Sequence, residues 1–223
     1  YCAYPPNWTW WGTVDTAAID RQFDEVIAVN PNVRFICMVD LNTPYWMYRR
    51  LGLQGYDSFC GLSNALCSDK WRAETEAYLR LFLAHVESRY ADRVLGYVLA
   101  CGMTTEWMDV SDWYASPNKT EKWNAWRRAK GLAPASVPSP DRLQRATFDN
   151  FIRDPSRERV ELDYVAFSNE TVADAIVRFA ARAREVIPAE RKLGVFFGYV
   201  LQLWSGALTS YGHLGYEKVF ASG

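Results

Sequence analysis

The stretch that decides the fold is Val94-Leu95-Gly96-Tyr97-Val98-Leu99-Ala100, which runs into Cys101-Gly102-Met103-Thr104-Thr105-Glu106-Trp107. An apolar run that follows an amphipathic helical pattern is typical of a buried strand in a parallel sheet. In such sheets, the residues that carry chemistry collect at the carboxyl ends of the strands. Glu106 is therefore the first candidate for a catalytic group.

The neighbours of Glu106 favour a role as a general acid. Small and hydroxylated residues precede it, and Trp107 follows. A carboxyl group held against an aromatic surface has its charged form disfavoured, so it can donate a proton near neutral pH. The alternative is a loop carboxylate with no chemical task, and the sequence leaves both open.

Composition and charge limit the partners. The chain has 223 residues, of which 49% are hydrophobic, enough for one large α/β domain or two small ones. The net charge is −1 and no stretch is rich in Lys and Arg, so the electrostatic footprint of a nucleic-acid-binding protein is missing. No apolar run approaches the roughly 18 residues of a membrane span. We expect neither nucleic acid nor membrane as a partner.

The cysteine pattern predicts no metal or cofactor. Five cysteines at irregular spacing, with no C-x-x-C motif, argue against a zinc ribbon or a thioredoxin-type site. Cys60 and Cys67 could pair in an oxidising compartment, but reduced thiols are favoured. The opening residues lack the basic and apolar regions of a secretory signal, and we expect the interior of a longer protein or a processed product.

Hydrophobic periodicity predicts helices alternating with strands along the chain. Ser168 is the expected N-cap of the last long helix, and Ser68 or Asp69 that of the middle one. Residues 109–164 are predicted to be a long, mostly irregular insertion with a short helix near 121–130. The predicted helices are 15–29, 69–90 and 168–187, and the predicted strands are 34–40, 94–100 and 192–201.

This alternation indicates an α/β fold with a parallel sheet. We favour a (β/α)₈ TIM-barrel type over a doubly wound sheet because no Gly-rich phosphate turn follows any strand. The patterns G-x-G-x-x-G, G-x-x-x-x-G-K-[ST], H-E-x-x-H and G-x-S-x-G are absent. The sequence therefore gives little support for a nucleotide-dependent enzyme or a zinc protease.

Residues 96–107, with Asn42-Thr43-Pro44-Tyr45-Trp46 upstream and residues 194–199 downstream, resemble the catalytic barrel of β-galactosidase-like glycoside hydrolases. The most similar group is family 42 and its relatives in the clan of retaining (β/α)₈ glycosidases. The resemblance implies that Glu106 is the general acid/base at the end of the fourth barrel strand. Thr105 precedes it where the family usually has Asn or a Gly-rich turn.

The resemblance also implies that the chain is a single partial barrel domain, covering about strands three to five. The family's nucleophile, a Glu at the end of the seventh strand, would then lie beyond Gly223. Retaining O-glycosyl hydrolysis is the first hypothesis, and a non-catalytic carbohydrate-binding or structural barrel fragment is the second. An unrelated Trp-rich α/β interaction protein is the third. Open strand edges predict self-association or association with the remainder of the barrel.

Residues at the predicted strand ends are the candidates for binding a carbohydrate substrate. Polar side chains there could bond sugar hydroxyls, although a strand-end Asp equally often caps a turn. Tryptophan could provide flat faces for sugar rings, although it is also a common core residue. His213 is expected to be a loop surface residue, and His85 is assigned no function. The candidates are Asp40, Asn42, Trp46, Thr105, Trp107, Tyr199, Gln202 and Trp204.

Overall fold

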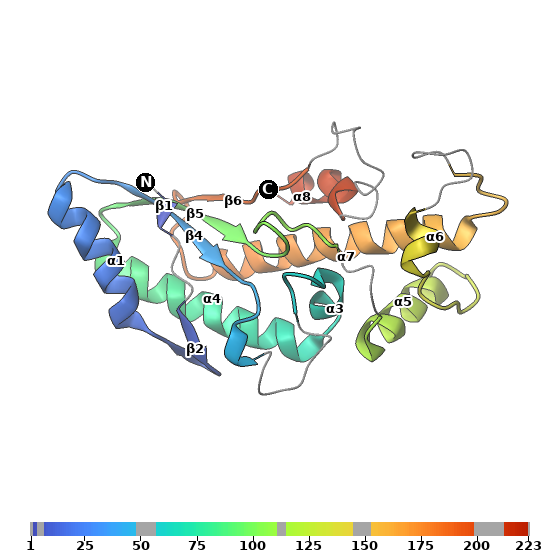
Figure 1. The fold of residues 1–223 in the computed structure, drawn as a ribbon. Helices are drawn as coiled ribbons and strands as arrows, with labels where there is room; N and C mark the ends of the chain where they lie inside the picture. The colour runs from blue at the N-terminus through green and yellow to red at the C-terminus, as the bar shows by residue number, and fades with distance from the viewer. Residues whose placement is uncertain are drawn as a thin grey trace.

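The computed structural model describes residues 2–3, 7–47, 57–110, 115–144, 153–198 and 212–222. Its centre is a parallel sheet with the strand order β1-β4-β5-β6 (Figure 1). The strands are β1 (Cys2–Ala3), β4 (Phe35–Asp40), β5 (Val94–Ala100) and β6 (Lys192–Gly194). Among the described residues the sheet is open, with β1 and β6 at its edges. The chain is therefore an α/β protein in which no barrel closure is observed.

Two of the three predicted strands are confirmed almost residue for residue, and the third is shorter than predicted. β4 and β5 pair in register from Ile36 opposite Gly96 to Asp40 opposite Ala100. The third strand was expected over 192–201, but only β6 pairs with β5. Residues 195–198 continue outside any strand, and 199–201 lie outside the described residues.

The first two long helices begin at capping residues that lie at their predicted starts. α1 (Thr16–Val29) follows Asp15, whose side chain accepts a hydrogen bond from the Ala18 N–H at 2.9 Å. α4 (Asp69–Tyr90) follows Ser68, whose hydroxyl accepts from the Trp71 N–H at 3.2 Å. Each cap satisfies a backbone donor that has no partner inside its helix. Ser68, rather than Asp69, is thus the cap of α4.

The third long helix, α7 (Arg159–Arg184), begins well before its predicted start. The prediction that Ser168 caps it is wrong, because Ser168 is buried inside the helix. Its hydroxyl donates to the Asp109 carboxylate at 3.2 Å, so its polar group is satisfied from another part of the chain. α5 (Pro117–Ala129) and α6 (Pro140–Gln144) precede α7, so the described part of the 109–164 segment is more helical than predicted.

The chain also forms several smaller elements. β2 (Trp8–Trp10) and β3 (Thr13–Val14) form an antiparallel hairpin after β1. α3 (Leu62–Leu66) lies between β4 and α4 along the chain. Near the end of the chain, the short 3₁₀ helix η2 (His213–Gly215) leads directly into α8 (Tyr216–Ala221).

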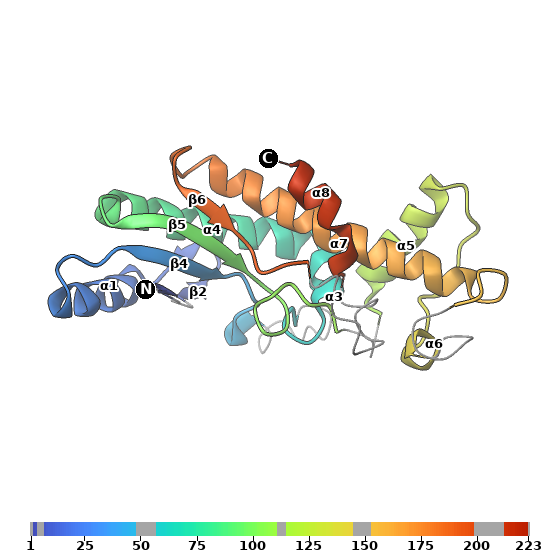
Figure 2. The ribbon, with the colours of Figure 1, turned by 90° about the horizontal axis from the view of Figure 1, so that it is seen from above.

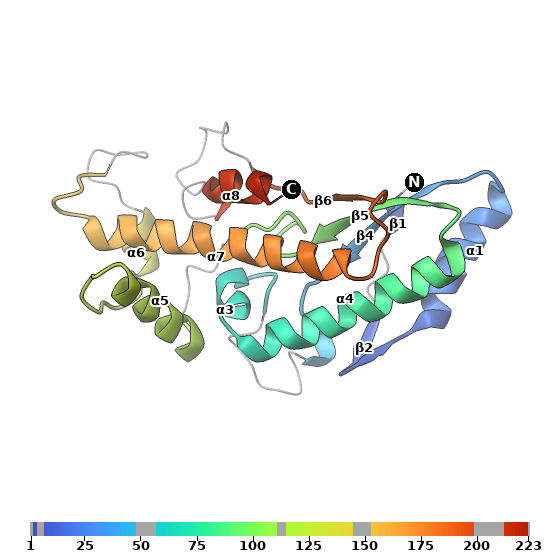
Figure 3. The same ribbon diagram turned by 180° about the vertical axis from the view of Figure 1, so that it is seen from behind.

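The long helices cover one face of the sheet. Figures 1 and 3 show α1, α4 and α7 on the same side of the strands, and in Figure 2, which is seen from above, β5 and β6 lie in front of α4. Phe35 and Val39 are fully buried on this side, whereas Ile36 is 44% exposed and Leu95 is 51% exposed. Apolar residues thus occur on both faces, and the helices of the described residues cover one of them.

A second, smaller core joins α5 to α7. The Trp123 ring lies 5.7 Å from Tyr164 and 5.4 Å from Phe167, measured between ring centroids. Beside it, the buried Arg127 guanidinium lies 3.0 Å from the Asp163 carboxylate. These aromatic residues, placed at helical spacing on both elements, pack the predicted insertion onto α7.

Candidate functional site

The turn after β5 has an unusual backbone. Three of its residues that are not glycine have left-handed φ angles: Thr104 at 54°, Thr105 at 65° and Trp107 at 61°. The turn closes through a bridge between Met103 and Met108. Left-handed conformations are costly for β-branched residues such as Thr, and they persist only where the surroundings enforce them. Such strain is concentrated at functional sites in proteins.

This turn presents the Glu106 carboxylate beside a hydroxyl group. The Thr104 hydroxyl donates to Glu106 Oε2 at 2.8 Å. Glu106 is half-buried and Thr104 is exposed, so the carboxylate lies at the rim of the protein. A carboxylate in this place can exchange a proton with a molecule bound at the carboxyl end of β5.

Trp107 supports the turn from inside the protein. Its side chain is fully buried, and its indole Nε1 donates to the Leu99 carbonyl at 2.8 Å. Its ring centroid lies 6.1 Å from that of Phe179 on α7. The indole therefore offers no exposed face, and the structure corrects the expectation that Trp107 could stack on a sugar ring.

Asn42 joins the ends of β4 and β5. Its Oδ1 accepts from the Gly102 N–H at 2.9 Å, and its Nδ2 donates to the Gly102 carbonyl at 3.2 Å. The buried Ser58 hydroxyl also donates to Oδ1, at 2.7 Å. Gly102 has a left-handed φ of 75°, and a Cβ there would lie 2.9 Å from the Met108 carbonyl oxygen. Asn42 thus holds the start of the turn at a position that requires glycine.

Asp40 lies at the end of β4 and caps the next turn. Its carboxylate accepts from the Asn42 N–H at 2.9 Å, in agreement with the alternative that a strand-end Asp caps a turn. Burial, assisted by the Asp40 charge, raises the pKa of the Cys101 thiol. Cys101 is therefore protonated near neutral pH and is not a nucleophile. A substrate contact by Asp40 remains a prediction.

Trp46 belongs to an aromatic group that we call the Trp cluster, formed by Trp8, Trp10, Trp11 and Trp46. The Trp46 indole donates to the Trp8 carbonyl at 2.7 Å, and its ring centroid lies 4.9 Å from that of Trp10 and 5.1 Å from that of Trp11. Trp10 is 39% exposed. The hairpin partners of Trp46 were missed, although the dense Trp8-Thr9-Trp10-Trp11-Gly12 stretch signals them.

His213 was also missed as a site residue. It is buried rather than a loop surface residue, and its ring hydrogen-bonds the backbone of Glu106 and Trp107. Burial lowers the pKa of His213, against the opposing effects of those hydrogen bonds and of the Glu106 charge. Glycines at positions 212 and 215 were the available signal, because glycine often marks a close approach of the backbone.

The structure thus brings Asp40, Asn42, Thr105, Glu106 and Trp107 to neighbouring strand ends. Tyr199, Gln202 and Trp204 lie outside the described residues, and their substrate contacts remain predictions. Cys60 and Cys67 carry free thiols.

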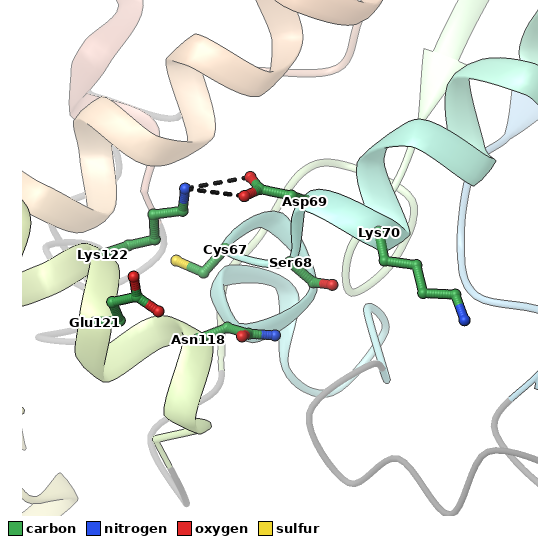
Figure 4. Close-up of a pocket in the computed structure, with 7 residues that line it drawn as sticks. All are labelled: Cys67, Ser68, Asp69, Lys70, Asn118, Glu121 and Lys122. Atoms are coloured by element: carbon green, nitrogen blue, oxygen red, sulfur yellow. Dashed lines mark hydrogen bonds and ion pairs between the residues drawn. The ribbon is translucent and has the colours of Figure 1, made fainter.

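The pocket in Figure 4, of about 210 Å³, lies away from this edge. It is found where the first turn of α4 approaches α5, and the Lys122 ammonium lies 3.2 Å from the Asp69 carboxylate there. Burial raises the pKa of the Cys67 thiol in its wall to about 12, so this thiol is inert at neutral pH. None of the predicted site residues lines this pocket.

Within the described residues, no group of three or more His, Cys, Asp and Glu side chains is arranged to hold a metal ion. No helix in the same part of the chain is both long and apolar enough to cross a membrane. Comparison of the sequence with protein-family models finds no match, and no curated protein is significantly similar to it.

Proposed function

We propose that this chain is the acid/base-bearing part of a retaining glycoside hydrolase of the β-galactosidase-like type, with Glu106 as general acid/base. One observation carries the proposal: a half-buried glutamate stands on a strained turn at the carboxyl end of a central parallel strand. This is the place where (β/α)₈ enzymes keep their catalytic residues. The resemblance of residues 96–107 to that family agrees with it.

The sheet supports a partial barrel. Its strands follow one another in chain order, and right-handed crossovers between successive strands place every helix on the same side. A doubly wound sheet would reverse its strand order and carry helices on both faces. We therefore propose that β4, β5 and β6 are the third to fifth barrel strands. The open face with Ile36 and Leu95 would then line the barrel interior.

In this proposal Glu106 protonates the glycosidic oxygen as the bond breaks, and then activates the water that releases the sugar. The partner carboxylate would stand about 5 Å away across the scissile bond, on a barrel strand outside these 223 residues. The Thr104 hydroxyl, which donates to Glu106, orients the carboxylate. Asn42 was expected to contact the sugar, but we propose that it orients the turn through Gly102.

The leaving group tests the role of Glu106 in the complete enzyme. Glu106→Gln should lower kcat/KM for natural glycosides by about 10²- to 10⁴-fold. It should slow aryl glycosides with good leaving groups much less, because these need no protonation. Glu25→Gln, a change on the exposed side of α1, is the matched control. Equal losses on both substrate types would contradict the assignment.

The chain by itself gives a second test. Without the seventh-strand carboxylate, the 223-residue protein should bind saccharides weakly and show no measurable turnover. Robust hydrolysis by this chain would contradict the proposed strand count. Asp40 and Asp109 would then be the first candidates for a second carboxylate.

A non-catalytic carbohydrate-binding protein is the second candidate, favoured by the partly exposed Trp cluster. An indole face is apolar and rigid, and it can pack against the C–H face of a sugar ring. Trp10→Ala should then abolish the saccharide-induced change in Trp fluorescence, while Glu106→Gln should leave it unchanged. Phe220→Ala, which removes an aromatic ring that is 75% exposed on α8, is the control.

One sheet face is not covered by any helix of the described residues, and we propose that a partner covers it. Exposed apolar residues such as Ile36 and Leu95 favour self-association or binding to the remainder of the barrel. Light scattering of the isolated chain should therefore detect oligomers whose fraction increases with concentration. A monodisperse monomer at high concentration would contradict the half-barrel proposal and favour a complete small α/β domain.

A further inference from the structure

The turn that carries Glu106 needs support from outside itself. Thr104, Thr105 and Trp107 are left-handed, and such residues relax to other conformations unless packing and hydrogen bonds hold them. Inside the turn, the Trp107 N–H donates to the Cys101 carbonyl at 2.6 Å. Asn42 holds the first residue of the turn. The Glu106 N–H likewise donates to the Met103 carbonyl at 3.2 Å, and the backbone of Glu106 and Trp107 also bonds to a residue from a distant part of the chain.

That residue is His213. His213 is 1% exposed, and Nδ1 of its ring bonds to the backbone of Glu106 and Trp107. On another side the ring packs against Phe197, with 4.7 Å between centroids. The imidazole is thus enclosed between the turn and the segment that follows β6.

The segment around His213 is fixed to α7. Gly212 is left-handed with a φ of 83°, and a Cβ there would lie 2.5 Å from Val172 Cγ2. The Asn169 side-chain oxygen accepts from the Leu214 N–H at 2.6 Å. Figures 1 and 3 show η2 and α8 lying along α7, close to the loop that follows β5. The position of the imidazole is therefore set by α7 rather than by the turn.

We propose that His213 is a positioning residue for Glu106. Docking of η2 on α7 places the imidazole against the turn, where it holds the backbone of Glu106 and Trp107. The carboxylate is thereby kept at the carboxyl end of β5. The importance of that carboxylate for catalysis rests on the proposed function, whereas the role of His213 in fixing the turn does not.

The surroundings of the ring suit a neutral imidazole that donates to the backbone. The Glu106 carboxylate is the charged group that acts on it. The other residues around η2 carry no charge: Asn169 and Val172 from α7, and Phe197 from the segment after β6. A substitution that keeps a donor but cannot become charged should therefore preserve the function of His213, and an apolar one should not.

Hydrogen exchange on the whole 223-residue chain tests the proposal. In His213→Leu, the turn amides at 101–108 should exchange at least tenfold faster, and the side-chain carboxyl ¹³C resonance of Glu106 should shift. His213→Gln should restore much of both, because its amide can donate to a carbonyl. His85→Gln is the control, since the chain has two histidines and His85 Nε2 lies 2.8 Å from Asp20 on α1 instead. It should leave the turn unchanged.

Two results would overturn the proposal. One is a folded His213→Leu protein with unchanged turn exchange and Glu106 resonance. The other is acceleration spread evenly over α7 and the sheet, which would show a general packing role. If His213→Leu does not fold, Asn169→Ala, which loosens the Leu214 N–H, should produce the same local effect, and its failure to do so would also overturn the proposal. Because Glu106→Gln kinetics are measured separately, a loosened turn with unaltered hydrolysis would contradict the proposed function alone.

Discussion

The turns that follow β4 and β5 are neighbours with opposite orientations. Both contain a tryptophan, and Asn42 links them through Gly102. After β4, the polar side chains bond to backbone groups, while the half-buried Trp46 packs on the partly exposed hairpin. After β5, Trp107 is fully buried and bonded to its own strand, and the acidic side chain lies at the rim.

This difference teaches how a strand end becomes able to carry chemistry. Left-handed residues around Glu106 turn the indole inward and the carboxylate outward. The β4 turn, in which no described residue other than glycine is left-handed, keeps its polar atoms occupied. The strain is therefore on the side of the molecule where the proposed acid/base stands, as expected when strain is maintained for function.

Replacing Trp107 and Trp46 by alanine, one at a time, should give the largest difference in the free energy of unfolding between the two turns. Trp107→Ala should lower the free energy of unfolding by about 3–5 kcal/mol, because it empties a fully buried site. Trp46→Ala should cost about 1–2 kcal/mol, because its ring is only half-buried. Urea denaturation followed by circular dichroism measures both. Equal losses would remove the contrast between the two turns.

The bond between the turns is the next target. Asn42→Ala leaves both polar backbone groups of Gly102 without their side-chain partner and should cost about 1–3 kcal/mol. Ser58→Ala removes bonds to Asn42 and to the Thr43 N–H, and should cost about 1 kcal/mol. Urea denaturation of both variants measures the difference. A Ser58→Ala loss as large as that of Asn42→Ala would show that Asn42 is not the principal link.

The regular elements could be predicted because their signals are local. An apolar run defines β5, and the side chains of Asp15 and Ser68 mark the starts of α1 and α4 within a few residues. The start of α7 could not be predicted in the same way. Ser168 has the chemistry of a cap, and only its tertiary bond to Asp109 shows that it lies inside the helix.

The candidate site shows the same division. The position of Glu106 follows from its place after a strand, which the sequence contains. The inward rotation of Trp107 depends on left-handed backbone angles at residues such as Thr104 and Thr105. Thr disfavours these angles, so the residue types do not predict them. His213 reaches the turn only because α7 holds η2, and such a contact between distant segments has no local signal.

Acid should destabilise the turn after β5 more than the turn after β4, because His213 lies beside the turn after β5. Burial lowers the pKa of His213 in the folded chain below its ordinary value, which applies to the unfolded chain. At a pH between the folded and the unfolded pKa, the unfolded chain therefore binds more protons than the folded one. Stability from this group is therefore complete above about pH 6.5 and is lost as the pH falls through that value.

This pH dependence can be isolated by substitution. The urea midpoint of the unsubstituted chain should fall between about pH 7.5 and about pH 5, and the fall should be smaller in His213→Gln, which cannot be protonated. Identical pH profiles for the two proteins would contradict the burial of a neutral imidazole beside the turn.

The smallest expected change in stability comes from relieving the backbone strain at Thr104 and Thr105. A left-handed residue with a Cβ costs about 1–2 kcal/mol, whereas glycine accepts this conformation and loses about 0.5–1 kcal/mol in backbone entropy. Thr105→Gly should therefore stabilise the chain by up to about 1 kcal/mol. Thr104→Gly should gain less, because it also removes the hydroxyl that donates to Glu106.

Measuring unfolding and hydrolysis in these two variants separates strain from function. If the strained turn serves to hold Glu106 outward, Thr105→Gly should make the chain more stable while lowering the activity of the complete enzyme, because a relaxed turn lets the carboxylate move. If Thr105→Gly destabilised the protein, the left-handed angle at this residue would not be a source of strain. The turn after β5 would then differ from the turn after β4 in its aromatic packing alone.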